Sequence, residues 1–181
     1  MMIRARAVFS LVFVLLGTLS SPAQTKETMT VKVFFHNEKL NPNQQECTKV
    51  FPTTRTIPKT KAIARAALEE LFKGATEEER KNEFWSFGPE ETRDIIKGLN
   101  VKGGVAYLNF KKVVFEKLGN TTSSCGGGFY SSIEKTLTQF PTIKKVVYAV
   151  EGNTNDFYEW VQVGECPHGK HCDSQNFTSD R

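Results

Sequence analysis

The sequence predicts a single α+β domain in which a mixed β-sheet carries two main helices on one face. Apolar and polar residues alternate in several short segments, and apolar residues recur at helical spacing in two longer ones. These segments follow one another as strand, strand, helix, hairpin, helix and strand. The length of 181 residues suits one domain with its own core.

The first two strands are expected at residues 30–36 and 49–57. Apolar side chains alternate through the first segment. Pro52 interrupts the second, and because proline lacks an N–H, this segment belongs at the edge of a sheet. Unpaired backbone groups at an edge invite strand addition by a partner or by another copy. Self-association through residues 49–57 is therefore one hypothesis.

The first main helix is expected at residues 61–73. Gly74 is well placed as the residue just past its end. Thr76 and Glu79 have the spacing of a capping box, so a second, short helix is expected to begin there. The apolar face of the first helix holds Ile63, Ala64, Ala67, Leu68, Leu71 and Phe72.

The remaining segments alternate between packed loops, strands and helices. Gly103-Gly104 is a two-residue turn signal, which predicts a β-hairpin around it. Pro141 is expected to stop the second main helix. In chain order we expect a packed loop at 82–89, the hairpin at 99–110, a weak helix at 111–118, the second main helix at 129–140, a central strand at 143–150 and a short helix at 157–161.

The first 23 residues are expected to be a secretory signal peptide. Arg4 and Arg6 precede an apolar run at 7–16, and Ser21-Pro22-Ala23 suits cleavage after Ala23. That run is too short to span a bilayer. We therefore expect a secreted or periplasmic chain of the cell envelope, with no membrane span after cleavage. Its parts are a linker at 24–28, a domain at 29–162 and a polar tail at 163–181.

The charge of the chain argues against nucleic acid as a partner. Removal of Arg4 and Arg6 with the leader lowers the formal net charge from +4 to +2. A protein that neutralises many phosphates normally carries a larger, clustered positive charge.

Four cysteines follow the leader: Cys47, Cys125, Cys166 and Cys172. An even count in an exported chain indicates disulfides, and four cysteines allow three connectivities. We favour Cys47–Cys125 with Cys166–Cys172, because the second pair closes a short local loop. A Cys47–Cys125 bond would close a long loop and stabilise the domain by roughly 4 kcal/mol.

Two other uses of the cysteines stay open at this point. Cys125 precedes a glycine run and a helix, where a thiol has a lowered pKa and could act as a nucleophile with His36 as its base. The chain would then be a thiol-dependent or cell-wall-active hydrolase. In the tail, Cys166, His168, His171 and Cys172 are ligand types for zinc or copper, although a local disulfide is favoured.

Other signs of catalysis are few, and no cofactor is expected. Gly-x-Ser-x-Gly, His-Glu-x-x-His and phosphate-loop motifs do not occur in the sequence. Aromatic side chains are the better hint of binding, because they can anchor a partner. The candidates are Phe84, Trp85, Phe87 and Trp160, although capping the core of a small domain is the favoured explanation for them.

Five segments together resemble the GerMN domain of sporulation and spore-germination proteins in order and spacing. They lie within residues 29–162, at 31–35, 54–58, 66–74 with 76–79, 103–110 and 136–146. The resemblance implies an α+β module with a binding or assembly role, and it brings no catalytic residues to carry over. The chain is thus expected to be a non-enzymatic envelope module whose partner is an envelope protein or peptidoglycan.

Overall fold

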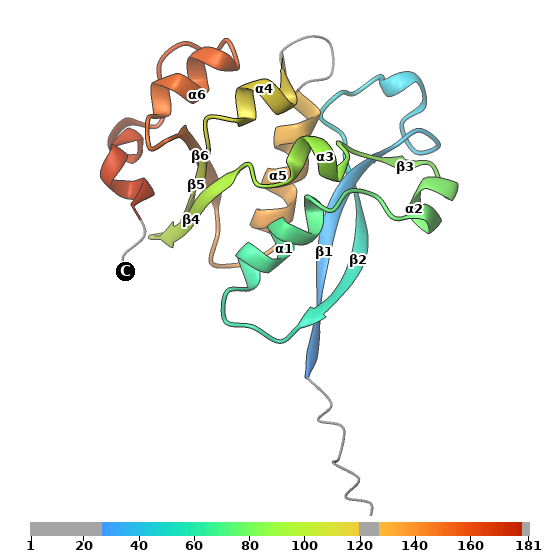
Figure 1. Cartoon of the computed structure of the whole chain (residues 1–181). Coiled ribbons are helices and arrows are strands. Elements are labelled where there is room, and N and C mark those ends of the chain that lie inside the picture. Colours follow the sequence, from blue (N-terminus) through green and yellow to red (C-terminus); the bar gives the residue numbers. More distant parts are fainter. Residues whose placement is uncertain (1–26, 120–126, 179–181) are drawn as a thin grey trace, which may run out of the picture.

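The structure is a computed structural model that describes residues 27–119 and 127–178 (Figure 1). The strands are β1 (Thr28–Asn37), β2 (Phe51–Pro58), β3 (Phe84–Trp85), β4 (Ile96–Lys102), β5 (Val105–Phe110) and β6 (Lys145–Val150). The helices are α1 (Ile63–Leu71), α2 (Glu77–Lys81), α3 (Pro89–Thr92), α4 (Val114–Leu118), α5 (Gly127–Thr138) and α6 (Thr154–Trp160). Short 3₁₀ turns are η1 (Pro42–Gln44), η2 (Gly169–Cys172) and η3 (Ser174–Phe177).

The six strands form two three-stranded sheets, in the orders β2-β1-β3 and β4-β5-β6. The central strand predicted at 143–150 is therefore wrong, because β6 lies at the edge of its sheet, and its apolar run reflects the burial of its side chains. The first sheet is antiparallel, whereas β5 pairs antiparallel with β4 and parallel with β6. The α+β class is confirmed, but the expected single sheet is divided in two. The physical reason lies at the edge of β1 away from β2, where the side chains of Thr136 in α5 and of Gln139 just after it take the hydrogen bonds that another strand would need.

The core lies between the two main helices and the sheets. Helix α5 packs against β1, β6 and α1 (Figure 1). The apolar face predicted for the first helix is the one it buries, with Ala67, Leu68 and Leu71 inside. One large cluster joins these elements, and its fully buried members include Val33, Phe35, Leu68, Ile95, Leu108, Phe110, Val114, Ile133 and Leu137.

Every residue of β5 is buried because both faces of its sheet are covered. Helices cover one face. The described part of the predicted tail, residues 163–178, covers the other face with Phe177, which packs edge-on against Tyr107 at a centroid distance of 5.5 Å. Its contacts show that this segment is folded onto the domain, although its composition is polar.

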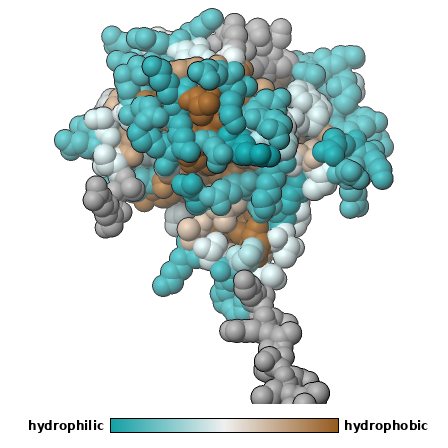
Figure 2. All heavy atoms as spheres, in the orientation of Figure 1, coloured by the Kyte–Doolittle hydropathy of each residue, from teal (hydrophilic) through white to brown (hydrophobic). Residues whose placement is uncertain are grey.

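The segment at 82–89 differs from the packed loop that was expected. Phe84 and Trp85 form β3 and pair with the last two residues of β1. The hairpin, the capping box and the edge position of β2 are as predicted. Within the described residues, no helix is long and apolar enough to cross a membrane. Hydrophilic side chains dominate the face shown in Figure 2.

Candidate binding edge at β2

The far edge of β1 is closed by hydrogen bonds. The Lys32 backbone N–H donates to the Gln139 side chain at 2.8 Å, and the Gln139 amide donates back to the Lys32 carbonyl at 2.7 Å. The Phe34 N–H donates to the Thr136 hydroxyl at 3.3 Å. The next even-numbered residue, His36, pairs with β3. Even-numbered residues of β1 therefore point their backbone groups away from β2.

This alternation fixes which backbone groups of β2 are free. Strand residues direct their N–H and C=O alternately to the two sides. Lys32 is opposite Thr54 and Thr30 is opposite Thr56, so the backbone groups of both threonines point away from β1. The N–H of Lys59, an odd-numbered residue, donates to Glu27 just beyond the ladder, in agreement with this pattern.

Among the described residues, no hydrogen bond is made by the outward N–H groups of Thr54 and Thr56, so the outer edge of β2 is a short open window. Pro52 and Pro58 occupy the same outward-facing set as Thr54 and Thr56. The lack of an N–H at these two prolines removes no hydrogen bond between β1 and β2, since the backbone groups at those positions do not bond to β1. The window offers two N–H groups, from Thr54 and Thr56, and is closed at both ends by a proline.

A surface groove runs beside this edge, between β2 and α2. It is lined by residues 52–56 of β2 and by Thr76, Glu78, Glu79, Asn82 and Phe84. An extended segment added to β2 would lie along this groove. Helix α2 forms the far wall of this groove. The groove keeps room for such a segment only if α2 stays at a fixed distance from β2.

An ion pair between Arg55 and Glu79 holds this wall in place. Both side chains are nearly buried, with 12% and 10% of their surfaces exposed. The Arg55 guanidinium donates to both carboxylate oxygens of Glu79, one of them at 2.5 Å. The Thr53 hydroxyl also donates to Glu79 at 2.5 Å, and the Thr76 N–H donates to it at 2.8 Å as part of the capping box.

The pKa of Glu79 reflects this arrangement. Burial by itself would raise the pKa, but the hydrogen bonds from Arg55, Thr53 and Thr76 and the charge of Arg55 outweigh it. The pKa falls to about 2 from its ordinary value of 4.5. Glu79 is therefore ionised throughout the ordinary pH range, and α2 is tied to β2 by charge-assisted bonds.

An edge strand of the other sheet, β4, is built differently. Its ladder with β5 is interrupted between Ile96 and Gly98, and lysines stand at positions 97 and 102. Irregular pairing and lysine are common devices that discourage strand addition. Of these two edge strands, β2 is thus the better suited to accept a partner.

The aromatic candidates are divided between two places and are all half-buried. Trp85 stacks on His36 with centroids 4.4 Å apart, and Phe87 packs edge-on against Phe129. Trp160 packs against Phe115, and its indole N–H donates to a backbone carbonyl. Capping the core accounts for these contacts. Phe84 alone among the candidates also lines the β2 groove.

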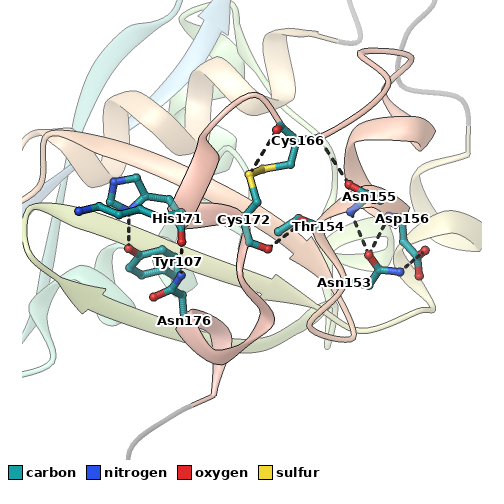
Figure 3. The surroundings of a disulfide bond; sticks show 10 residues. Tyr107, Asn153, Thr154, Asn155, Asp156, Cys166, His171, Cys172 and Asn176 are labelled. Atoms are coloured by element: carbon teal, nitrogen blue, oxygen red, sulfur yellow. Dashed lines mark hydrogen bonds between the residues drawn. A yellow bond between two sulfur atoms is a disulfide. The ribbon is translucent and has the colours of Figure 1, made fainter.

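The cysteines give one disulfide that the structure describes in full. Cys166 and Cys172 are joined, as favoured from the sequence (Figure 3). Cys47 is disulfide-bonded, but Cys125 lies outside the described residues, so their pairing stays a prediction. His36, the base that a Cys125 nucleophile would need, is buried under Trp85. Burial lowers its pKa, although hydrogen bonds with backbone groups of Gly128 and Lys49 act in the opposite direction.

The histidines of the tail make contacts within the domain. His171 Nδ1 lies 2.7 Å from the Tyr107 hydroxyl (Figure 3), and His168 packs edge-on against Tyr158. The thiols of Cys166 and Cys172 are consumed by their disulfide. Across residues 27–119 and 127–178, no group of three or more His, Cys, Asp or Glu side chains could hold a metal ion.

Comparison with known proteins decides the family. A family model described as "Germane: Sporulation and spore germination" matches residues 32–156. The chain belongs to the GerMN (Germane) family. No curated protein matches this GerMN chain.

One solved structure shows the same fold, and two others are similar over part of it. The tandem GerMN domains of the sporulation protein GerM from Bacillus subtilis are 22% identical, with a TM-score of 0.53. That match covers 74% of this chain and 42% of the other, so this chain spans less than half of its length. The first GerMN domain of GerM is 18% identical, with a TM-score of 0.48, and the match covers 84% of this chain and 99% of that domain. A putative lipoprotein from Clostridium perfringens is 18% identical, with a TM-score of 0.40 over 68% of this chain and 75% of that one.

Sequence reasoning missed the residues that shape the β2 groove. Glu79 was identified only as part of a capping box, and Arg55 was not singled out. Pro52 and Pro58 lie an even number of positions apart, so their backbone groups point to the same side of the strand. This spacing is the sequence signal that could have shown where the open edge begins and ends.

Proposed function

We propose that this GerMN chain is an exported, non-enzymatic binding and assembly module of the cell envelope that holds a partner protein by strand addition at β2. The open edge between Pro52 and Pro58 is the observation that carries the proposal. The secretory leader expected at residues 1–23 supports the envelope location. A protein partner is favoured over peptidoglycan because an extended polypeptide can pair with backbone N–H and C=O groups in register.

The surface around β2 favours recognition through the backbone. Among the described residues, the large apolar side chains that are exposed are Leu40, Val101 and Val163, and none of them belongs to β2. Each backbone hydrogen bond contributes about 1 kcal/mol net. A few such bonds give weak binding once the entropy of association is included. Side chains of the partner that enter the groove beside α2 would supply specificity.

A substitution at Thr54 tests the proposal, because this residue presents an outward N–H. Thr54→Pro removes that N–H and leaves the ladder to β1 intact, whereas Thr54→Val keeps the N–H and the shape of the side chain. Each mature protein would be immobilised and exposed to envelope extract. We expect proteins retained by the wild type and by Thr54→Val to be lost with Thr54→Pro, at an unchanged melting temperature.

Co-sedimentation with purified peptidoglycan, at low and moderate salt, is the companion measurement. Pelleting that resists salt and is the same for all three proteins would place the partner in the wall and overturn strand addition. Cleavage of the wall would overturn the non-enzymatic role. Retention of the same envelope proteins by Thr54→Pro would show that the edge is not the binding site.

A further inference from the structure

The β2 window is complementary to itself, and we propose that its partner is a second copy of the same chain, paired antiparallel about a two-fold axis at Arg55. This inference rests on the proposed binding edge and names its occupant. It would join two copies of the sheet β2-β1-β3 into one continuous six-stranded sheet.

The outward groups are placed symmetrically about Arg55. Thr54 and Thr56 lie one residue to either side of it, and Pro52 and Pro58 lie three residues to either side. Antiparallel pairing at this centre places Thr54 of one copy opposite Thr56 of the other. Each such pair exchanges two N–H···O bonds, so the two pairs make four.

The prolines define the ends of the pairing. At this register, Pro52 of one copy lies opposite Pro58 of the other, and neither residue has an N–H to leave unpaired. A slip by two residues would instead place a threonine opposite a proline. One threonine carbonyl in each copy would then have no donor across the interface. The register centred on Arg55 is the one in which both backbone groups of both threonines are paired.

The side chains agree with this arrangement. Thr54 and Thr56 are exposed on one face of the strand, where threonine opposite threonine is a favourable cross-strand pair. On the other face the two Arg55 side chains come opposite each other, an arrangement that normally repels. Here each guanidinium is already bonded to the Glu79 carboxylate of its own copy, so its charge is compensated.

A two-fold pairing also limits the assembly to two copies. It uses the same edge on both chains and leaves no second β2 edge for a third. The other edge strand considered above, β4, has interrupted pairing and lysines at 97 and 102. The product is therefore a closed dimer and not a fibre.

Sedimentation equilibrium of the mature chain over a concentration series tests the stoichiometry. We expect a reversible monomer–dimer equilibrium. Thr54→Val should weaken it only slightly, because this variant keeps the outward N–H and loses only the threonine–threonine side-chain pair. Thr54→Pro removes two of the four bonds across the axis, so its dissociation constant should rise on the order of 30-fold. Circular dichroism and melting of each variant show that it is folded.

Cysteine pairing tests the register. Thr54→Cys and Thr56→Cys proteins, mixed in equal amounts and mildly oxidised, should form a disulfide-linked heterodimer, because opposed Cα atoms lie about 5.5 Å apart. Each variant alone should cross-link much more slowly, since its two cysteines are diagonal and about 7–8 Å apart. Faster cross-linking of either variant alone would overturn the two-fold axis at Arg55.

The two proposals fail in different ways. Suppose that the wild type is monomeric at every concentration, and that an envelope protein binds the immobilised wild type but not Thr54→Pro. This result would overturn the proposal that the partner is a second copy, and it would still support strand addition at β2. A dimer that Thr54→Pro does not weaken overturns pairing at this edge.

Discussion

The ion pair behind the β2 groove gives the sharpest test of how the candidate site is built. Glu79→Gln keeps a side chain that can still take part in the capping box, but it removes the charge that faces Arg55. A pKa that falls from 4.5 to about 2 corresponds to about 3 kcal/mol of unfolding free energy at neutral pH. Breaking a buried pair from one side typically costs about 3–5 kcal/mol, which agrees. We therefore expect Glu79→Gln to be about 3 kcal/mol less stable in urea denaturation at pH 7.

The stability that the ionised Glu79 carboxylate contributes should depend on pH in a definite direction. Because folding lowers the pKa of Glu79, its contribution is fully present above the unfolded value near 4.5. It is lost as the pH falls through about 2. The difference between the wild type and Glu79→Gln should therefore shrink across this window. Glu78→Gln is the matched control, since it makes the same charge change on an exposed side chain of the same helix. The reasoning is refuted if the two variants differ by less than about 1 kcal/mol at pH 7.

Four further variants test other parts of the structure by the same denaturation assay. Gln139→Leu should cost about 1 kcal/mol, because it removes the bonds that close the far edge of β1, and an unchanged protein would show that water replaces them fully. Gly128→Ala should cost about 2 kcal/mol, because its new Cβ would collide with the imidazole of His36 and with the backbone carbonyl of Cys47, and a neutral result would mean that both can move aside. Tyr148→Phe should be neutral or stabilising by up to about 1 kcal/mol, since that buried hydroxyl has no hydrogen-bond partner among the described residues, and a clear loss would reveal a partner. Replacing Cys166 and Cys172 together by serine should cost about 2 kcal/mol, as expected for opening a short loop, and no change would show that packing alone holds the segment.

Local patterns were sufficient to predict most elements of this GerMN chain. The apolar face of α1, the capping box at Thr76 and the turn at Gly103-Gly104 depend on residues close together in the sequence. A proline within β2 likewise predicted an edge strand, because the lack of an N–H is a property of the residue itself.

The predictions that failed involved contacts between distant segments. A single sheet was expected because strand patterns do not tell which edges will pair. Gln139, about a hundred residues from Lys32 in the sequence, occupies the edge of β1 and separates the sheets. The two residues of β3 were taken for a loop because two residues are too few for a pattern.

The sequence by itself determined the class of fold, the family and the position of the open edge, because each depends on local spacing or on one residue type. Only the tertiary structure decided which backbone groups of β2 face outward, since this follows from the bonds of β1 to Gln139 and Thr136. It also decided that Arg55 and Glu79 meet, twenty-four residues apart, and that they line the groove. Such contacts are set by packing, which brings together side chains whose sequence separation carries no information about their distance.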